Sequence, residues 1–212
     1  MQAIVAAGGD PLDDAWRASL PEADLVVAAD SGLAHLYALG LTPHVVVGDL
    51  DSVDPSHLDR AIREGARIDC HPTDKEATDL ELALAVAQEL GATEVTVIGG
   101  GGGRLDHLIG GVNVLAAPGW STMRITALSG PARLTVIHDQ AELVGAVGSI
   151  VTLLAVGGTA RGITTDGLRW ALHNEGLAAT STRGVSNEVS GSPVTVRVRR
   201  GTLLAIQPTG GR

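Results

Sequence analysis

Residues 45–52 read Val-Val-Val-Gly-Asp-Leu-Asp-Ser, an unbroken apolar run that ends in two carboxylates. A run without alternation of apolar and polar residues is typical of a strand buried on both faces of a sheet. Residues 3–7, 25–29 and 95–98 have the same character. Helical segments with typical capping residues separate these runs, at 12–20, 33–39, 57–64 and 80–90. Strands that alternate with helices predict a mostly parallel α/β sheet for this half of the chain.

The pattern changes near residue 123, beyond which short β-type runs are separated by turn residues. The expected strands are 124–128, 133–138, 149–155, 159–163, 194–198 and 202–207. Val-Gly-Gly-Thr at 156–159 and Arg-Arg-Gly-Thr at 199–202 indicate hairpin turns. We therefore expect an α/β domain over residues 1–122, followed by a β-sandwich domain over residues 123–212.

The composition indicates a folded chain and disfavours several classes of protein. A chain of 212 residues can bury a core without disulfides, and its one cysteine, Cys70, has no partner, so we expect the cytoplasm as its compartment. The first apolar stretch is too short for a signal peptide or a membrane span. A net charge of −9 and a scarcity of aromatic residues disfavour binding to nucleic acid.

The charge is unevenly distributed along the chain. Residues 1–107 hold 19 acidic and 6 basic side chains, whereas residues 108–212 hold 5 acidic and 9 basic ones. An acidic half is most often a solvated surface, but it can also contain carboxylates that hold a divalent cation. The spacing of the acidic residues has to decide between these interpretations.

Acidic residues follow the predicted strand ends in four segments, at 29–32, 48–52, 73–79 and 103–107. In a parallel sheet these ends lie along one edge. Asp49 and Asp51 are two residues apart, so in an extended segment both side chains point the same way and repel unless a cation lies between them. Mg²⁺ prefers such hard oxygen ligands. For any one segment, and for Asp30 in particular, the alternative is an Asx turn or a helix cap.

Lys75 is the only lysine among 15 basic residues, and it lies within the densest acidic run. A compact ammonium at this position is suited to a phosphate oxygen. The competing interpretation is an ordinary surface ion pair with Asp74 or Glu76. Thr78 is expected to cap a helix whose first turn holds Asp79, which would place Asp79 near the positive end of the helix dipole.

Five consecutive glycines, residues 99–103, follow the apolar run at 95–98. Such a loop lets backbone N–H groups approach an anion, although it lacks the ending of a Walker A motif. Arg104, Asp106 and His107 come directly after it, where Arg104 can grip a phosphate and Asp106 can accept a ribose, metal or proton contact. The alternative is that Asp106 only begins a helix. The other histidines lack zinc-ligand spacing, and nucleophilic catalysis by Cys70 has no identifiable base.

Taken in order, these segments resemble the signatures of the thiamine pyrophosphokinase family. The matching segments are Ala-Asp-Ser-Gly at 29–32 with Gly-Asp-Leu-Asp-Ser at 48–52, Thr-Asp-Lys at 73–75 with Thr-Asp at 78–79, and Gly-Arg-Leu-Asp-His at 103–107. Residues 164–172 and 183–188 resemble its thiamine-binding segments. Five ordered motifs over most of the chain are specific. The chain departs from the family's usual Asp-Gly-Gly by having Ser31 in the middle position, and its glycine run is longer than the family's loop.

The resemblance implies an enzyme that transfers the pyrophosphoryl group of Mg-ATP to the hydroxyethyl oxygen of thiamine, giving thiamine diphosphate and AMP. Catalysis of such a transfer is mostly positioning and charge neutralisation. The implied ligands of Mg²⁺ are Asp49, Asp51 and Asp79, which are catalytic together with Arg104. The implied phosphate contacts are Lys75 and Arg104, Asp30 and Asp106 are candidates for nucleotide or metal contacts, and His107 is a further implied nucleotide contact. The general base is left unassigned.

The resemblance also implies a homodimer, with the α/β domain holding Mg-ATP and the β-sandwich completing a thiamine site at the subunit interface. Trp170 would contact the cationic and aromatic rings of thiamine, although a tryptophan in a β domain is more often part of the core. Ser186 and Asn187 would hydrogen-bond the aminopyrimidine, or else form a polar turn.

Two rival functions are weighed against this one. A pyrophosphokinase of the same architecture that acts on another alcohol, such as a pterin, would be separated from it by a substrate screen. A non-catalytic sensor of thiamine or nucleotide has no need of the complete charged set, which is Asp49, Asp51, Asp79, Arg104 and Asp106.

Overall fold

The computed structural model describes residues 1–102 and 104–209 and divides into two compact units, each with its own buried core. The first unit comprises residues 1–114 and 125–130, and the second comprises residues 115–124 and 131–212. Gly103, the last residue of the glycine run, lies outside the described residues. The domain boundary expected at residues 122–123 stays a prediction.

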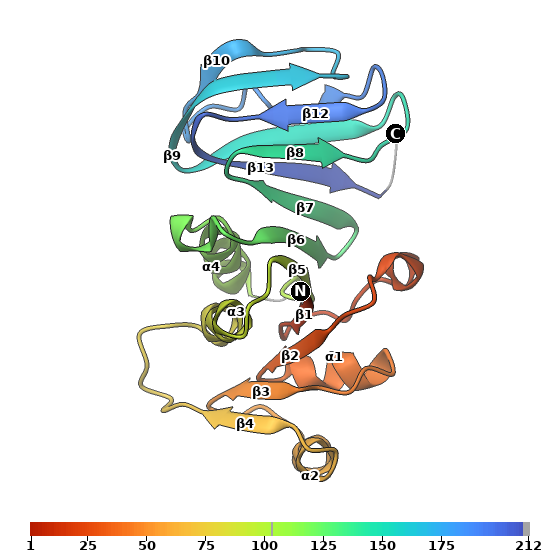
Figure 1. Ribbon diagram of the computed structural model, residues 1–212, viewed down its shortest axis with the longest axis vertical. Coiled ribbons are helices and arrows are strands. Elements are labelled where there is room, and N and C mark those ends of the chain that lie inside the picture. Colours follow the sequence, from red (N-terminus) through yellow and green to blue (C-terminus); the bar gives the residue numbers. More distant parts are fainter. Residues whose placement is uncertain (103, 210–212) are drawn as a thin grey trace. The chain divides into compact units, whose positions relative to one another are not determined.

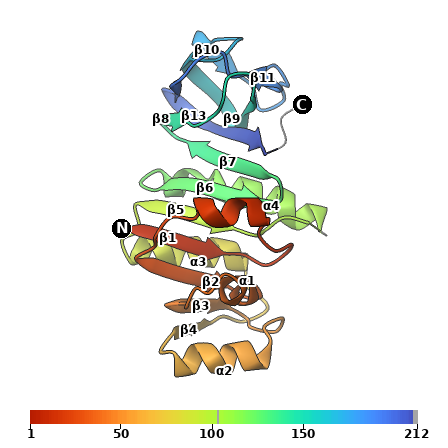
Figure 2. The same ribbon diagram turned by 90° about the vertical axis from the view of Figure 1, so that its right-hand side faces the viewer.

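The first unit is built on a sheet with the strand order β4-β3-β2-β1-β5-β6. Its strands are β1 (Gln2–Ala6), β2 (Leu25–Ala29), β3 (Val45–Gly48), β4 (Arg67–Cys70), β5 (Glu94–Ile98) and β6 (Arg124–Ser129). Strand β1 pairs in parallel with β2 and β5, and β3 pairs in parallel with β2 and β4 (Figures 1 and 2). This pairing brings the carboxyl ends of β1, β2, β3 and β5 to one edge of the sheet.

Helices connect the strands of this unit, so its α/β character is as predicted. They are the 3₁₀ helix η1 (Asp14–Ser19) and the α-helices α1 (Gly32–Ala38), α2 (Pro55–Arg63), α3 (Asp79–Glu89) and α4 (Leu105–Leu115). The α-helix expected at 12–20 is wrong, because only the short 3₁₀ turn forms there. Strand β4 is largely polar and is not predicted by its sequence. The sequence offers α4 only as the alternative in which Asp106 begins a helix, since Gly110 and Gly111 weaken the helical pattern.

Close packing of α1 and capping of α3 position the helices at the edge that carries the site. Leu33 and Leu36 of α1 are fully buried in one cluster with the strands. Gly32 allows this packing, since a Cβ there would lie 2.1 Å from the carbonyl oxygen of Ala6. Thr78 accepts the N–H of Glu81 at 3.3 Å, which confirms the expected cap of α3.

The second unit is β-rich, with the strand order β7-β13-β9-β12-β8. Its elements are η2 (Pro118–Trp120), β7 (Ala132–Ile137), β8 (Gln140–Leu143), β9 (Ile150–Asp166), β10 (His173–Leu177), β11 (Asn187–Glu188), β12 (Val194–Arg197) and β13 (Arg200–Pro208). Strands β10 and β11 also pair with the long strand β9, and these pairs are antiparallel.

Both hairpins expected in this unit are wrong. Residues 156–159 do not turn the chain back, because β9 runs through them; Gly157, with a φ of +72°, only interrupts the regular strand conformation. Residues 199–202 do not join paired strands either, since β12 and β13 both pair with β9. Glycines inside a strand allow irregularities as well as turns, and the local sequence does not separate the two cases.

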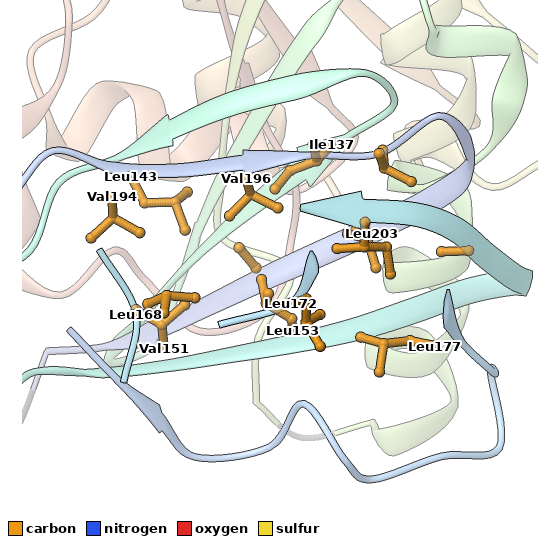
Figure 3. Packing of buried hydrophobic residues seen from close by; sticks show 14 of the residues in the cluster. Ile137, Leu143, Val151, Leu153, Leu168, Leu172, Leu177, Val194, Val196 and Leu203 are labelled. Atoms are coloured by element: carbon orange, nitrogen blue, oxygen red, sulfur yellow. The ribbon is translucent and has the colours of Figure 1, made fainter. Parts of the chain in front are cut away.

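Apolar side chains from most of the strands form the core of the second unit. Figure 3 shows Leu143, Val194 and Val196 facing Val151 and Leu153 of β9. Alternate residues of β9 are buried, as a strand with one face on a core requires. The arrangement as a β-sandwich stays a prediction. No helix in the described part of the chain is long and apolar enough to cross a membrane.

Candidate functional site

The carboxyl ends of the parallel strands surround a cavity of about 460 Å³ in the first unit. Residues that follow β1, β2 and β5 line it, together with the first turns of α3 and α4. The predicted site residues in its lining are Asp30, Asp79, Arg104, Asp106 and His107. Its volume lies in the range of small-molecule sites, and its position outside the strand ends is where α/β sheets bind ligands.

Asp30, Asp49 and Asp51 form what we call the carboxylate cluster, in which one oxygen of each residue lies within 4.8 Å of the others. Asp49 and Asp51 do converge, but the reason expected from the sequence is wrong. Leu50 between them has a φ of +64°, so this segment turns instead of extending. The N–H of Asp51 lies 3.4 Å from Asp49 Oδ1, to which it donates within this turn.

Asp30 is held by contacts with the segment that follows β3. Its φ of +48° is unusual for a residue other than glycine, and its N–H donates to the carbonyl oxygen of Val47 at 2.9 Å. The Ser52 hydroxyl donates to Asp30 Oδ2. Oδ1 of Asp30 is buried, and within residues 1–102 and 104–209 it has no hydrogen-bond partner. An unpaired buried oxygen beside two further carboxylates fits a hard cation.

Lys75 bridges two carboxylates that come from different segments. Its ammonium donates to Asp49 Oδ2 at 2.9 Å and lies 3.1 Å from Asp79 Oδ1. The side chains of Lys75 and Asp49 are only 14% and 12% exposed, so the interpretation as an ordinary surface pair is wrong. Their hydrogen bond is the main cause that raises the pKa of Lys75 and lowers the pKa of Asp49.

The carboxylate cluster is crowded with like charge. The pKa of Asp51 is raised, first by the charge of Asp49, then by partial desolvation and the charge of Asp30. Repelling carboxylates with a free oxygen have the donor set that Mg²⁺ prefers, so the residues present fit this metal. The structure thus groups Asp30 with Asp49 and Asp51, whereas Asp79 lies against Lys75. The role of Asp79 as a metal ligand stays a prediction.

Two glycine-containing loops lie side by side at the cavity. The N–H of Gly100 donates to the carbonyl oxygen of Gly8 at 2.7 Å, and the N–H of Asp10 donates to that of Gly101 at 2.8 Å. The glycine run was singled out from the sequence, but the loop after β1 was missed. Its signal was Gly-Gly-Asp directly after a buried strand, since glycines at that place allow close approach of backbone and ligand.

Arg104 and Asp106 pair with each other at the start of α4. Arg104 donates through Nε to Oδ1 at 3.2 Å and through Nη2 to Oδ2 at 2.5 Å. These bonds lower the pKa of Asp106 to about 2, so the carboxylate stays ionised. Both side chains are about two-thirds exposed, at 68% and 65%. The remaining guanidinium donors of Arg104 are therefore accessible to a ligand in the cavity, as is the exposed His107.

Trp170 in the second unit is 56% exposed, so its interpretation as a core residue is wrong. The guanidinium carbon of Arg169 lies 4.9 Å from the centroid of its ring. Asn187 is buried; it donates to the carbonyl oxygen of Trp170 at 2.9 Å and accepts the N–H of Trp170 at 3.1 Å. Its amide is thus committed to the Trp170 backbone. Ser186 is exposed, and its N–H donates to Thr152 Oγ1 at 3.0 Å.

Comparison with known proteins matches both halves of the chain. The protein-family model "Thiamin pyrophosphokinase, catalytic domain" matches residues 16–127, and the family model "Thiamin pyrophosphokinase, vitamin B1 binding domain" matches residues 135–203. Thiamine pyrophosphokinase of Bacillus subtilis (strain 168) is 24% identical over 97% of both chains. Thiamine pyrophosphokinase 1 of Arabidopsis thaliana is 29% identical over 79% of this chain and 67% of its own length.

A solved structure has the same fold over nearly the whole length. The crystal structure of thiamin pyrophosphokinase from Geobacillus thermodenitrificans superimposes with a TM-score of 0.81 at 28% identity, covering 99% of this chain and 98% of the other. The catalytic-domain match alone spans more than half of the residues, and it includes the carboxylate cluster and the lysine bridge. These matches extend the resemblance of the motifs to the chain as a whole, which therefore belongs to the thiamin pyrophosphokinase family.

Proposed function

We propose that this chain transfers the pyrophosphoryl group of ATP to thiamine and so produces thiamine diphosphate and AMP. The observation that carries the proposal is the carboxylate cluster beside a ligand-sized cavity, in a chain of this family. The hydroxyl oxygen of thiamine forms a bond to the β-phosphorus of ATP. The bond from that phosphorus to the oxygen on the α-phosphorus breaks, AMP leaves, and the hydroxyl proton passes to a nearby carboxylate.

Asp30, Asp49 and Asp51 are the residues that would hold Mg²⁺, and bound Mg²⁺ supplies charge neutralisation at the phosphate oxygens. The support is the unpaired Oδ1 of Asp30 and the mutual repulsion of the three carboxylates. Asp79, which the sequence places among the ligands, lines the cavity and orients the Lys75 ammonium. We propose this orienting role for Asp79 beside the predicted one.

Phosphate oxygens would be held by two cationic side chains: Arg104, which lines the cavity, and Lys75, which contacts Asp79 of the cavity lining. The Lys75 ammonium is positioned by two carboxylates, so it presents its remaining proton with little loss of rotamer freedom. Arg104 has donors beyond those used by Asp106, and its exposed side chain leaves them accessible to a ligand. Asp106 and His107 line the same cavity and are proposed nucleotide contacts.

Thiamine would contact the exposed ring of Trp170, and the buried Asn187 would position that ring through the Trp170 backbone. Ser186 is exposed and free to contact the aminopyrimidine through its hydroxyl. We propose further that residues 1–122 form the catalytic domain, that residues 123–212 form a thiamine-binding β-sandwich, and that the thiamine site lies at the interface of a homodimer in the cytoplasm.

The direct test incubates the protein with ATP, Mg²⁺ and thiamine and follows AMP and thiamine diphosphate by chromatography. We expect both products in equal amounts, and none when EDTA replaces Mg²⁺. A pterin alcohol in place of thiamine tests the rival substrate. Thiamine binding without any AMP would instead identify a sensor and overturn the proposal.

A further inference from the structure

A basic pocket lies on the second unit, and of its lining residues only Thr164 falls within a segment that resembles the thiamine-binding motifs. It has a volume of about 320 Å³, and its polar lining comes from Asp139, Gln140, Thr164, Arg197 and Arg199. Volumes near this value are at the small end of ligand sites, so the pocket suits a compact group.

The floor of the basic pocket is a row of hydrogen-bond donors across three strands. Arg197 of β12 is directly opposite Gln140 of β8 on one side and Thr164 of β9 on the other. Residues directly opposite in antiparallel strands point to the same face of a sheet. The neighbouring Val196 is fully buried, so the row of Gln140, Arg197 and Thr164 belongs to the outer face.

Arg199 packs over Gly162 of β9, where the absence of a side chain makes room for it. A Cβ at Gly162 would lie 2.8 Å from Cγ and Cδ of Arg199, so only glycine lets the arginine stem pack on β9 at this position. Val198 between the two arginines is buried, and Arg197 and Arg199 both line the pocket. Two guanidinium groups thus line one small pocket.

Neither arginine is paired with a carboxylate in the described part of the chain. Among residues 1–102 and 104–209, no carboxylate lies within 4.0 Å of the guanidinium groups of Arg197 and Arg199, although Asp139 lines the same pocket. Oδ1 of Asp139 instead accepts the backbone N–H of Gln140 at 2.5 Å. A structural ion-pair network would have used this carboxylate, so the two cations are left available for an external anion.

We propose that the basic pocket binds a phosphate-type anion of diphosphate size, either free or as the end of an organic ester. Paired guanidinium groups recognise phosphate oxygens through parallel N–H donors. The Gln140 amide and the Thr164 hydroxyl add neutral donors on the same face. Asp139 lines the same pocket and opposes the binding of an anion by charge repulsion, so it limits the affinity that the two arginines provide.

Isothermal titration calorimetry of the full chain with inorganic diphosphate in EDTA tests the proposal. Diphosphate can also bind Lys75 and Arg104 in the first unit, so the basic pocket is measured by the part of the affinity that depends on Arg197, Arg199 and Asp139. We expect Arg197→Gln and Arg199→Gln each to weaken binding about tenfold, which is the usual size of a charge-assisted hydrogen bond. Asp139→Asn should tighten binding several-fold, because the repelling carboxylate is gone.

Arg200→Gln is the matched control, since Arg200 is exposed and close in sequence but does not line the pocket. It removes the same charge and should change the affinity less than about twofold. Equal losses of affinity in Arg197→Gln and Arg200→Gln would show general charge attraction and overturn the proposal. An unchanged affinity in Arg197→Gln, together with no gain of affinity in Asp139→Asn, would also overturn it. The arginine variants should lower the affinity, whereas Asp139→Asn should raise it. Loss of folding lowers the affinity of any variant, so it cannot produce both results.

Parallel titrations with ADP separate the two sources of the anion. A larger arginine-dependent affinity for ADP than for inorganic diphosphate would identify an organic ester, and equal values would identify the free anion; both support the pocket. The titrations contain neither thiamine nor Mg²⁺, so their outcome does not depend on whether the proposed transferase activity is correct.

Discussion

Asp49 and Asp51 are two residues apart, and yet their pKa values are shifted in opposite directions. Asp49 accepts a hydrogen bond from Lys75, which lowers its pKa, whereas Asp51 faces Asp49 and Asp30, which raise its pKa. A carboxyl group with a raised pKa in the folded chain lowers stability when it ionises, and one with a lowered pKa adds stability when ionised. Removing the charge should therefore change stability in opposite directions at the two positions.

We predict that Asp51→Asn leaves the melting temperature in EDTA unchanged or raised, whereas Asp49→Asn lowers it because Lys75 loses its acceptor. Both variants should lose at least about a hundredfold in turnover, since each removes one of the carboxylates that would hold Mg²⁺, whose charge neutralises the phosphate oxygens. Thermal melting and AMP formation measure the two effects. A higher melting temperature in Asp49→Asn would contradict the lysine bridge.

Lys75 provides a second prediction at the scale of single residues. Lys75→Ala and Lys75→Arg should both reduce kcat/KM for ATP by about a hundredfold. Alanine removes the cation, and the planar guanidinium of arginine does not fit between two carboxylates that hold a point charge at about 3 Å. Arg17→Ala, which removes an ordinary exposed pair with Asp14, is the control and should leave kcat/KM unchanged. Full activity in Lys75→Arg would mean that any cation suffices.

At the scale of elements, the end of β3 shows how backbone geometry forms the site. Gly48 has a φ of +147°, and a Cβ there would lie 3.0 Å from Asp79 Oδ1 and 3.1 Å from Asp30 Cβ. We predict that Gly48→Ala loses most of its activity, because both aspartates must shift. The control is Gly40→Ala. Gly40 also has a positive φ, of +74°, but nothing lies within 4 Å of a Cβ at this position. It should lose stability only, as measured by thermal melting.

Strand β11 gives the corresponding prediction in the second unit. Asn187→Ala leaves the N–H and carbonyl groups of Trp170 without their partners, which should cost about 1–3 kcal/mol of stability. It should also raise KM for thiamine, because the Trp170 ring is no longer held in position, while KM for ATP stays constant. Asn113→Ala, an exposed helical position with one side-chain bond to Ile109, is the control. A raised KM for ATP would show that Asn187 acts on folding instead of on Trp170.

At the scale of the whole molecule, the proposed dimer predicts complementation between subunits. Asp51→Asn and Trp170→Ala subunits should each be inactive as homodimers. If each thiamine site takes Asp51 from one subunit and Trp170 from the other, a mixed dimer has one intact site, so random exchange should restore about a quarter of the wild-type turnover. No recovery after exchange shown by mass spectrometry would place both residues of a site on one chain.

The α/β pattern of the first half was readable from the sequence because buried parallel strands are continuous apolar runs, and such runs survive in any context. Motif order likewise pointed to the family and to the aspartates, Lys75 and Arg104. Strand pairing in the second half was not readable in this way. Gly157 and Gly201 resemble hairpin turns locally, and only the partners of β9 decide that the chain continues or crosses over there.

The sequence by itself determined which charged groups are present and that they follow strand ends, since residue type and strand period are local properties. Only the tertiary structure decided how they combine: Asp30 joins Asp49 and Asp51, Asp79 lies against Lys75, and Asn187 holds Trp170. The physical reason is that these contacts depend on left-handed turns at Asp30 and Leu50 and on approach between distant segments. Such geometry is stabilised by the surrounding packing, and no spacing along the chain encodes it.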